Sequence, residues 1–393
     1  MSSAAQRLDG LLRGDLEALH ARSLYRVRCL VDGPQGAELL VDGRRYLNFS
    51  SNDYLGLAAH PVLREAARHA LHKYGVGSGA AHLITGHTRA HAALEEELAA
   101  FVQRPRALLF SSGYMANIGL AGVLVSRGDC ILEDRLNHAS LLDAGLLSGA
   151  RFSRYAHADP AALRERLTRP AKRTLVMTDG VFSMDGALAP LPALARTAEA
   201  AGAFLMVDDA HGVGVFGDHG RGSLEHFALG MAEVPVLMGT LGKALGTFGA
   251  FVAGSDALIE SLIQRARTYI YTTAPPACLA EATRAALKLV QVESWRREHL
   301  FRLIQRFRSG AAALGLPIMD SISAIQPLLL GEARKALLIS DKLREHGIFA
   351  PAIRPPTVPI GHARMRITLT AAHREEHIDR LLAALAQVIQ DNS

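Results

Sequence analysis

Short runs of β-favouring residues alternate with helical stretches between about residues 105 and 255 of this 393-residue chain. The runs that we expect to form strands are residues 107–110, 130–132, 174–178, 204–207, 236–238 and 250–253. Strands that alternate with helices form a mostly parallel sheet with helices on both faces. The sequence therefore predicts an α/β fold whose ligands bind beyond the carboxyl ends of the strands.

Both flanks of this region show helical periodicity. Residues 88–102 place Leu94, Leu98 and Phe101 at helical spacing, which predicts an amphipathic helix. The glycine-rich stretch before it, at 74–80, is either a flexible linker or backbone that approaches a ligand or partner closely. After Pro276 the expected elements are a helical stretch to about 314, a strand at 324–330, a helix at 332–346, a strand at 364–370 and a final helix. We expect three parts: an N-terminal segment at 1–50, a large domain at 51–285 and a smaller α+β C-terminal domain at 286–393.

Composition narrows the functional class. The chain is 49% hydrophobic and 21% charged, with a net charge of +5. Its basic residues are scattered among acidic ones, which disfavours nucleic-acid binding and favours an anionic small molecule as the substrate. No signal peptide or membrane-spanning run is present, so we expect a cytoplasmic protein. Cys29, Cys130 and Cys278 lack disulfide or zinc spacing. The HREEH motif at 373–377 is interpreted as a solvated helix face, and no metal site is predicted.

Lys243 is the most informative single residue. Six of the 43 basic residues are lysines, and this one lies among glycines and small apolar residues in the segment GTLGKALG at 239–246. Upstream, a buried strand ends in DDAHG at 208–212. Burial disfavours the ammonium form, so this amine can condense with an aldehyde such as that of pyridoxal phosphate. A carboxylate at the strand end can keep the pyridine nitrogen protonated.

Polar or glycine residues follow five of the predicted strands, at 111–114, 133–138, 179–183, 208–211 and 240–243. The turn SSGYMAN at 111–117 opens a helix and can bind a phosphate there, or it is an ordinary strand-to-helix turn. Residues 239–244 do not form a Walker loop, because Ala244 stands where a hydroxyl is needed. Arg354, in the proline-stiffened segment at 353–359, suits capture of a substrate carboxylate or a structural salt bridge.

Together these features resemble the α-oxoamine synthases, pyridoxal-phosphate enzymes with the aspartate-aminotransferase fold. The segments NFSSNDYLGL at 48–57, DGVFSMDG at 179–186 and VDDAHG at 207–212 are typical of the family, whereas SAIQP at 323–327 and IRPPTVP at 353–359 are similar to its biotin-pathway member. The resemblance spans nearly the whole chain. It implies fold type I of the pyridoxal-phosphate transferases, with a mostly parallel seven-stranded sheet in the large domain and a smaller α+β C-terminal domain.

The resemblance also implies roles for the polar residues of the strand-end loops. Lys243 would bind the cofactor aldehyde covalently and then act as the general base at the substrate Cα. Asp208 would pair with the ring nitrogen, and His138 would stack on the ring. His211 and Ser183 would contact its phenolic oxygen.

Further cofactor contacts are implied for Gly113, Tyr114 and Thr240. Thr272 and Thr273 would reach the phosphate of the neighbouring subunit in a homodimer with its active site at the interface.

Arg354 would bind the carboxylate of the amino-acid substrate. Asn52 and Thr357, with His138, would line the substrate site. Arg26 matches a substrate-binding arginine of the family in position, but its flanking residues differ.

The implied reaction is the decarboxylative condensation of L-alanine with a pimeloyl thioester on coenzyme A or an acyl carrier protein. Because the same machinery uses glycine with other thioesters, a 2-amino-3-ketobutyrate CoA ligase is the alternative within the family. An inactive paralogue that serves as a binding subunit is the alternative from another class, and the presence of Lys243 disfavours it.

Overall fold

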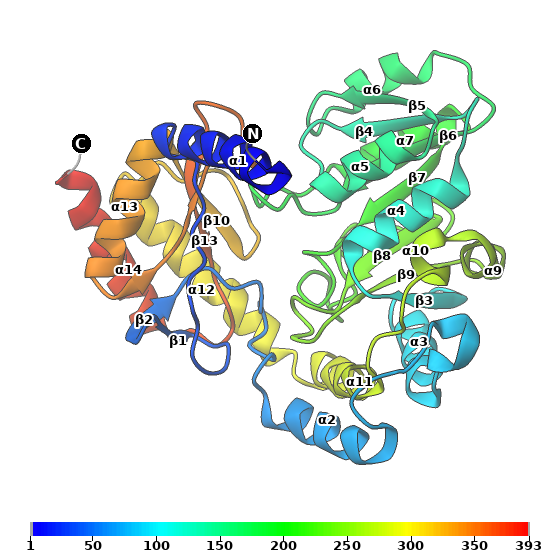
Figure 1. Ribbon diagram of the computed structural model, residues 1–393, viewed down its shortest axis with the longest axis horizontal. Coiled ribbons are helices and arrows are strands. Elements are labelled where there is room, and N and C mark those ends of the chain that lie inside the picture. Colours follow the sequence, from blue (N-terminus) through cyan, green and yellow to red (C-terminus); the bar gives the residue numbers. More distant parts are fainter. Residues whose placement is uncertain (1–2, 392–393) are drawn as a thin grey trace. The chain divides into compact units, whose positions relative to one another are not determined.

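The computed structural model describes residues 3–391, which divide into two compact units (Figure 1). Unit 1 contains the described residues up to 51, residues 303–369 and the described residues from 373 on; unit 2 contains residues 52–302 and 370–372. The N-terminal segment therefore belongs to the same unit as most of the predicted C-terminal domain. The domain limits at residues 50 and 285 stay a prediction.

A seven-stranded sheet in the order β3-β9-β8-β7-β6-β4-β5 forms the centre of unit 2. Only β9 is antiparallel to its neighbours, β3 and β8. The strands are β3 (Arg106–Phe110), β4 (Cys130–Asp134), β5 (Arg151–Tyr155), β6 (Thr174–Asp179), β7 (Phe204–Asp208), β8 (Val236–Thr240) and β9 (Ala250–Gly254). All six predicted strands are confirmed, and with them the α/β class and the seven-stranded, mostly parallel sheet.

The strand that the hydrophobic pattern missed is β5. It lies at one edge of the sheet and pairs only with β4. Arg151 and Arg154 are exposed, and Tyr155 is its one buried residue, so β5 has no apolar run. Charged side chains on an edge strand protect it from pairing with other chains.

Helices cover both faces of this sheet. Those that make the main contacts with its strands are α3 (Arg89–Phe101), α4 (Gly113–Leu124), α5 (Ala139–Leu147), α6 (Pro160–Leu167), α7 (Leu191–Ala200) and α9 (Asp256–Arg265). Unit 2 also contains α2 (Pro61–Tyr74), α8 (Ser223–His226), α10 (Arg267–Ile270), α11 (Ala277–Val292) and a π-helix at His82–Gly86. The helix predicted at 88–102 is confirmed as α3.

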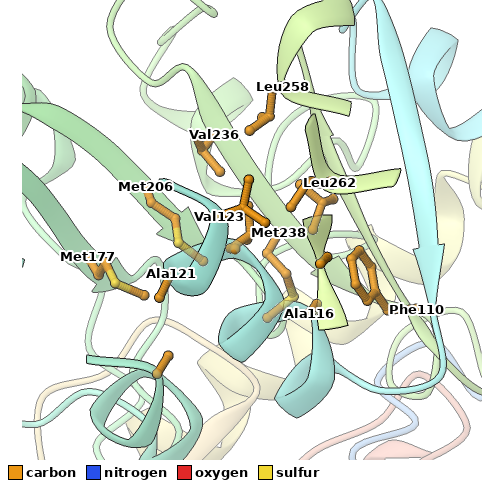
Figure 2. Close-up of a cluster of buried hydrophobic side chains, with 14 of the residues drawn as sticks. Phe110, Ala116, Ala121, Val123, Met177, Met206, Val236, Met238, Leu258 and Leu262 are labelled. Carbon is orange, nitrogen blue, oxygen red and sulfur yellow. The ribbon is translucent and has the colours of Figure 1, made fainter. Parts of the chain in front are cut away.

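The main core of unit 2 packs α4 and α9 against the sheet (Figure 2). Ala116, Leu120 and Ala121 of α4 are fully buried beside Phe110 of β3 and Met238 of β8. Each buried Leu or Phe contributes roughly 1.5–3 kcal/mol relative to an exposed one. This packing fixes the N-terminus of α4 at the carboxyl edge of the sheet, where the polar loops lie.

Unit 1 contains two three-stranded sheets, in the orders β1-β2-β11 and β10-β13-β12. Its strands are β1 (Glu38–Val41), β2 (Arg44–Asn48), β10 (Ile325–Gly331), β11 (Ile348–Phe349), β12 (Ala352–Ile353) and β13 (Ala363–Thr368), and its helices are α1 (Ala4–Ala21), α13 (Ala333–Glu345) and α14 (Glu375–Gln390). The predicted strand, helix, strand and helix after residue 320 are confirmed as β10, α13, β13 and α14. The helical stretch predicted to about 314 is two helices, because Glu293 leaves the helical conformation between α11 and α12 (Trp295–Ala313).

The interpretation of the HREEH motif as a solvated helix face is wrong for its two histidines, because His373 and His377 are buried and α14 begins only at Glu375. His373 Nε2 lies 2.8 Å from the carbonyl oxygen of Asn48, and His377 Nδ1 accepts a hydrogen bond of 3.3 Å from the backbone of Arg374. Cys29, Cys130 and Cys278 are free cysteines. Within residues 3–391, the helices are all too short or too polar to cross a membrane.

Candidate active site

The polar loops of unit 2 converge on one cavity of about 190 Å³ at the carboxyl edge of the sheet. Loops after β3, β4, β6, β7 and β8 all contribute to it, as the sequence predicted. The cavity is lined by Gly113, Tyr114, His138, Ser140, Asp179, Ser183, Asp208, Ala210, His211, Met238, Thr240 and Lys243. Eight of the predicted cofactor-binding residues are therefore together.

Lys243 begins a chain of hydrogen-bonded side chains. Its Nζ lies 2.9 Å from His211 Nε2, and His211 Nδ1 lies 2.6 Å from the hydroxyl oxygen of Tyr54. The Tyr54 hydroxyl donates to Asn52 Oδ1 at 3.3 Å. A proton on His211 Nδ1 satisfies all three contacts, since Nε2 then accepts from the lysine. The arrangement connects the amine at the cavity to Asn52 through two buried rings.

Asp208 ends β7 and is 5% exposed. Its Oδ2 accepts a hydrogen bond of 2.8 Å from Asn117 Nδ2, and its Oδ1 accepts one of 3.0 Å from the backbone of Ala210. Asn117 is fully buried on α4 and donates also to Ser140 Oγ at 2.8 Å. Asn117 on α4 and the backbone of Ala210 after β7 thus hold the Asp208 carboxylate in one orientation.

His138 caps the N-terminus of α5. Its Nδ1 lies 2.8 Å from Ser140 Oγ and accepts a second bond of 3.2 Å from the backbone of Ser140. Because Nδ1 accepts the backbone N–H of Ser140, it carries no proton; the Ser140 hydroxyl therefore donates to it, and the proton of the neutral ring is on Nε2. Burial lowers the pKa of His138, Lys243 lowers it further and Asp208 opposes the change. A neutral imidazole suits stacking against a cationic ring.

Asp179 supports the His138 loop from the neighbouring strand. It pairs with Asp208 in the register of β6 and β7, and its Oδ2 accepts a hydrogen bond of 2.9 Å from the backbone of His138. Burial, and then the charge of Asp208, raise the pKa of Asp179 well above its ordinary value. Two adjacent buried carboxyl groups disfavour a second negative charge, so Asp179 favours its protonated form beside Asp208.

Asp209 fixes the turn that carries His211. It is fully buried, and its Oδ2 accepts a hydrogen bond of 2.7 Å from the backbone of Ser223. A Cβ at Gly180, Gly212 or Gly222 would collide with this carboxyl group. Three glycines therefore provide the space that Asp209 occupies, and burial raises its pKa to about 7.

The remaining predicted cofactor residues of unit 2 lie at the ends of helices and strands or between two helices. Gly113 and Tyr114 open α4, whose cap Ser112 accepts from the backbone of Met115 at 3.2 Å, and the Tyr114 hydroxyl donates to Asp143. The side chain of Thr240 donates to the carbonyl of Gly249 at 3.0 Å. Thr272 and Thr273 lie between α10 and α11, outside the residues that line the cavity.

Three predicted substrate residues belong to unit 1. Arg26 donates to Thr357 Oγ1 at 3.3 Å, so the structure brings these two together. The Arg354 guanidinium donates to the carbonyl oxygens of Ser23 and, at 3.3 Å, Tyr25. Burial and the nearby Arg26 lower its pKa. The substrate-binding roles of these residues and of Asn52 stay predictions.

Sequence reasoning did not assign five residues that support the cavity: Tyr54, Asn117, Ser140, Asp179 and Asp209. Each of them lies inside a segment that the sequence had already singled out or directly beside one. Their types gave no further indication, because a buried hydrogen-bond partner looks like any other polar residue in a motif.

The cavity suits a planar aldehyde that carries a phosphate. It offers an amine for covalent attachment, an oriented carboxylate for a ring nitrogen and an imidazole for stacking. The N-terminus of the 12-residue α4 brings backbone amides and a partial positive charge to the same cavity, which favours a phosphate. These are the donors that pyridoxal phosphate needs.

Solved structures of pyridoxal-phosphate enzymes are similar to this chain. A serine palmitoyltransferase from S. paucimobilis, solved with bound PLP, is 26% identical with a TM-score of 0.93, and each chain covers 99% of the other. Serine palmitoyltransferase of Sphingomonas wittichii is 29% identical with a TM-score of 0.92 and the same coverage. The 8-amino-7-oxononanoate synthase of Francisella tularensis is 32% identical with a TM-score of 0.77, over 88% of this chain and 98% of that one.

Sequence relatives agree with these structures. The 8-amino-7-oxononanoate synthase of Nitrosococcus oceani is 64% identical over 95% of this chain and 100% of its own length. The enzyme of the same name from Thioalkalivibrio sulfidiphilus is 61% identical over 95% of this chain and 96% of its own length. Residues 44–385 match the family described as aminotransferase class I and II. The chain belongs to this aminotransferase family and, within it, to the 8-amino-7-oxononanoate synthases.

Proposed function

We propose that this enzyme condenses L-alanine with a pimeloyl thioester, releases carbon dioxide and forms 8-amino-7-oxononanoate, with pyridoxal phosphate as its cofactor. The names of its relatives support the product, and the PLP-bound serine palmitoyltransferase supports the cofactor. The observation that carries the proposal is the Lys243 amine, 2.9 Å from His211 Nε2 in a cavity that also contains Asp208.

Pyridoxal phosphate, when bound, accepts electrons from the substrate Cα into its protonated ring. Asp208 would hold the proton on the ring nitrogen, and Asn117 and Ala210 would keep its carboxylate aligned. His138 would stack on the ring with its proton on Nε2. Gly113, Tyr114 and Thr240 would hold the phosphate, and His211 and Ser183 would contact the phenolic oxygen.

Lys243 would move the protons of the reaction. Its Nζ would take the proton from the alanine Cα and later return one to the product. His211 Nε2, which accepts a hydrogen bond from Nζ, would keep the amine near the reacting carbon between these steps. Tyr54 would hold the His211 ring through Nδ1.

The substrate and assembly assignments extend this proposal. Arg354 would bind the alanine carboxylate, and Asn52, Thr357 and Arg26 would contact substrate. The enzyme would act in the cytoplasm as a homodimer. In that dimer Thr272 and Thr273 of one subunit would reach the phosphate of the other.

The test is product formation from matched pairs of substrates. Incubation with alanine or glycine, and with pimeloyl or acetyl thioesters, followed by product mass, should give 8-amino-7-oxononanoate from alanine and the pimeloyl thioester. Glycine and the acetyl thioester as the preferred pair would instead indicate a 2-amino-3-ketobutyrate CoA ligase.

The role of Lys243 is tested by Lys243→Ala against Lys73→Ala on exposed α2. The first variant should lose turnover and the borohydride-trapped cofactor adduct on the protein, and the second should keep both. Turnover by Lys243→Ala would refute the assignment.

A further inference from the structure

Three histidines come together between the π-helix and the first turn of α3. His82 begins the π-helix, His87 follows it, and His91 lies in the first turn of α3. His82 Nδ1 lies 3.0 Å from His87 Nδ1, and the ring centroids of the three residues are 5.2–5.7 Å apart. None of the three lines the cavity, and the proposed chemistry does not use them.

Hydrogen bonds fix the position of the proton on His91. Its Nδ1 accepts the backbone N–H of Thr88 at 3.0 Å and therefore carries no proton. Burial lowers the pKa of His91, so at neutral pH the ring is uncharged and its one proton is on Nε2. Nε2 lies 2.8 Å from the carbonyl oxygen of Pro275 and donates to it. This bond connects α3 to the segment between α10 and α11.

The glycine-rich stretch at 74–80 binds the same segment. Ser78 Oγ donates to the Pro275 carbonyl oxygen at 2.6 Å, so this oxygen accepts two hydrogen bonds. The backbone N–H of Ala274 donates to the carbonyl oxygen of Ala80 at 3.0 Å. The end of the glycine-rich stretch is therefore tied to residues 274 and 275 and is not a free linker.

The π-helix at His82–Gly86 packs against this pairing. The backbone of Gly86 donates to the carbonyl oxygen of Ala81 at 3.0 Å, and a Cβ at Gly86 would collide with the carbonyl oxygen of Ala80. Ala81 in turn pairs with Thr273 in an antiparallel bridge. The glycine thus lets the π-helix lie directly on the backbone that pairs with residues 273–274.

His82 supports the other end of the segment. Its ring stacks on that of Tyr269 in α10, with the ring centroids 4.9 Å apart and an interplanar angle of 12°. Both residues are buried, and burial together with the charges of His91 and His87 lowers the pKa of His82 to about 3. The histidines therefore contact the chain before Thr272, through Tyr269, and after it, through Pro275.

The surface around this segment is apolar. Four large apolar side chains of residues 76–84 and 271 are 49–78% exposed: Val76, Leu83, Ile84 and Tyr271. The bridge between Ala81 and Thr273 makes the two stretches neighbours. Exposed apolar side chains on adjoining segments are typical of a contact with another protein. A second copy of this chain fits this contact, because Thr272 and Thr273 do not line the cavity of their own chain.

We infer that His91 is a positioning residue that acts in trans, because it holds residues 272–275 of one subunit in place at the phosphate of the cofactor bound by the other subunit. This inference rests on the proposed function, in which Thr272 and Thr273 reach that phosphate. His91 acts through the carbonyl oxygen of Pro275 and does not touch the cofactor or the substrate.

The first test separates the phosphate from the rest of the cofactor. Dissociation constants of pyridoxal phosphate, and of pyridoxal, which lacks the phosphate, are measured by fluorescence. His91→Ala should bind pyridoxal phosphate about tenfold more weakly than wild type, because one hydrogen bond that places the segment is lost, and should bind pyridoxal as wild type does. The control His72→Ala, at an exposed histidine of α2, should change neither constant.

The second test shows which subunit His91 serves. A chain with Lys243→Ala and a chain with His91→Ala carry different affinity tags and are purified together as a mixed dimer. The one site with Lys243 belongs to the His91→Ala chain and receives residues 272–275 from the other chain, where His91 is intact. The adduct trapped there by borohydride should form at the wild-type concentration of pyridoxal phosphate, and turnover should be about half that of wild type, as expected for one intact site of two.

A mixed dimer that binds the cofactor as weakly as the His91→Ala homodimer would show that His91 serves its own site and would overturn the inference. Unchanged affinity of His91→Ala for pyridoxal phosphate, equal losses for pyridoxal phosphate and pyridoxal, or a monomeric wild-type protein would also overturn it. If His91→Ala does not fold, Ser78→Ala, which removes only the second donor to Pro275, replaces it with the same expectations.

Each of these contrary results leaves the proposed reaction standing. A wild-type protein that forms no product from alanine and a pimeloyl thioester would instead refute the proposed function itself.

Discussion

Glu133 is a buried acid that the proposed chemistry does not use, and it makes the stability of this enzyme depend on pH. It lies on β4 and is fully buried, and neither carboxyl oxygen forms a hydrogen bond of ordinary distance and angle. Burial raises the pKa of Glu133 to about 8, and Asn137 and Arg154 only partly offset this. The folded protein therefore holds this carboxyl group protonated at neutral pH.

The magnitude follows from proton linkage. The unfolded chain releases the Glu133 proton near pH 4.5, whereas the folded protein keeps it until about pH 8. Because the folded state binds the extra proton over this interval, the free energy of unfolding decreases as the pH rises through it. At about 1.4 kcal/mol per pH unit, the loss reaches roughly 3 kcal/mol at pH 7 and roughly 4 kcal/mol at pH 8, where the folded group is half ionised.

Glu133→Gln tests this, because glutamine has the shape of the protonated acid and does not ionise. Urea unfolding followed by circular dichroism should give equal midpoints for wild type and variant near pH 4.5. At pH 8 the variant should be more stable by several kcal/mol. Glu65→Gln on exposed α2, where Arg68 lowers the pKa of Glu65, should show no such gain. A wild-type advantage at pH 8, or a difference independent of pH, would mean that Glu133 is ionised and paired.

Three further predictions concern the supports of the cavity. Gly222→Ala places a Cβ against Asp209 at a φ of +103°, so it should cost about 3–5 kcal/mol of stability. The control Gly202→Ala, at a φ of +64° with open space around it, should cost about 1 kcal/mol. Equal shifts of the urea midpoint in the two variants would contradict this prediction. Asn117→Ala removes a hydrogen bond to the Asp208 carboxylate, so the dissociation constant for pyridoxal phosphate should rise about tenfold when measured by fluorescence. An unchanged dissociation constant would exclude a role for Asn117 in orienting Asp208. Tyr54→Phe removes the hydrogen bond between the Tyr54 hydroxyl and His211 Nδ1, so kcat/KM should fall about tenfold with little change in melting temperature. Full activity of this variant would show that the His211 ring does not need the bond.

The fold was predictable wherever burial imposes a pattern. Strands such as β6 and β7 are covered on both faces, so their apolar runs are continuous and easily recognised. The edge strand β5 is covered less and keeps exposed arginines, so periodicity gave no indication of it. The same holds for β11 and β12, which have two residues each and are too short to show a period.

The site was predictable in its reactive groups and not in their supports. Lys243, Asp208 and His211 stand out because a lysine among glycines and charged residues at a strand end are chemically unusual. Asn117 lies on a helix of mostly apolar residues, and its contact with Asp208 spans 91 positions of the chain. No spacing rule connects such residues, because the contact exists only once α4 has packed against the sheet.

The packing around Asp209 restricts how this site can change in evolution. A side chain at Gly180, Gly212 or Gly222 is compatible with the turn only after residue 209 has become smaller, and a smaller residue 209 gives up the bond to Ser223. Neither step is neutral by itself, so we expect the four positions to change together. Homologous chains in which one glycine has changed should also carry a different residue in place of the aspartate.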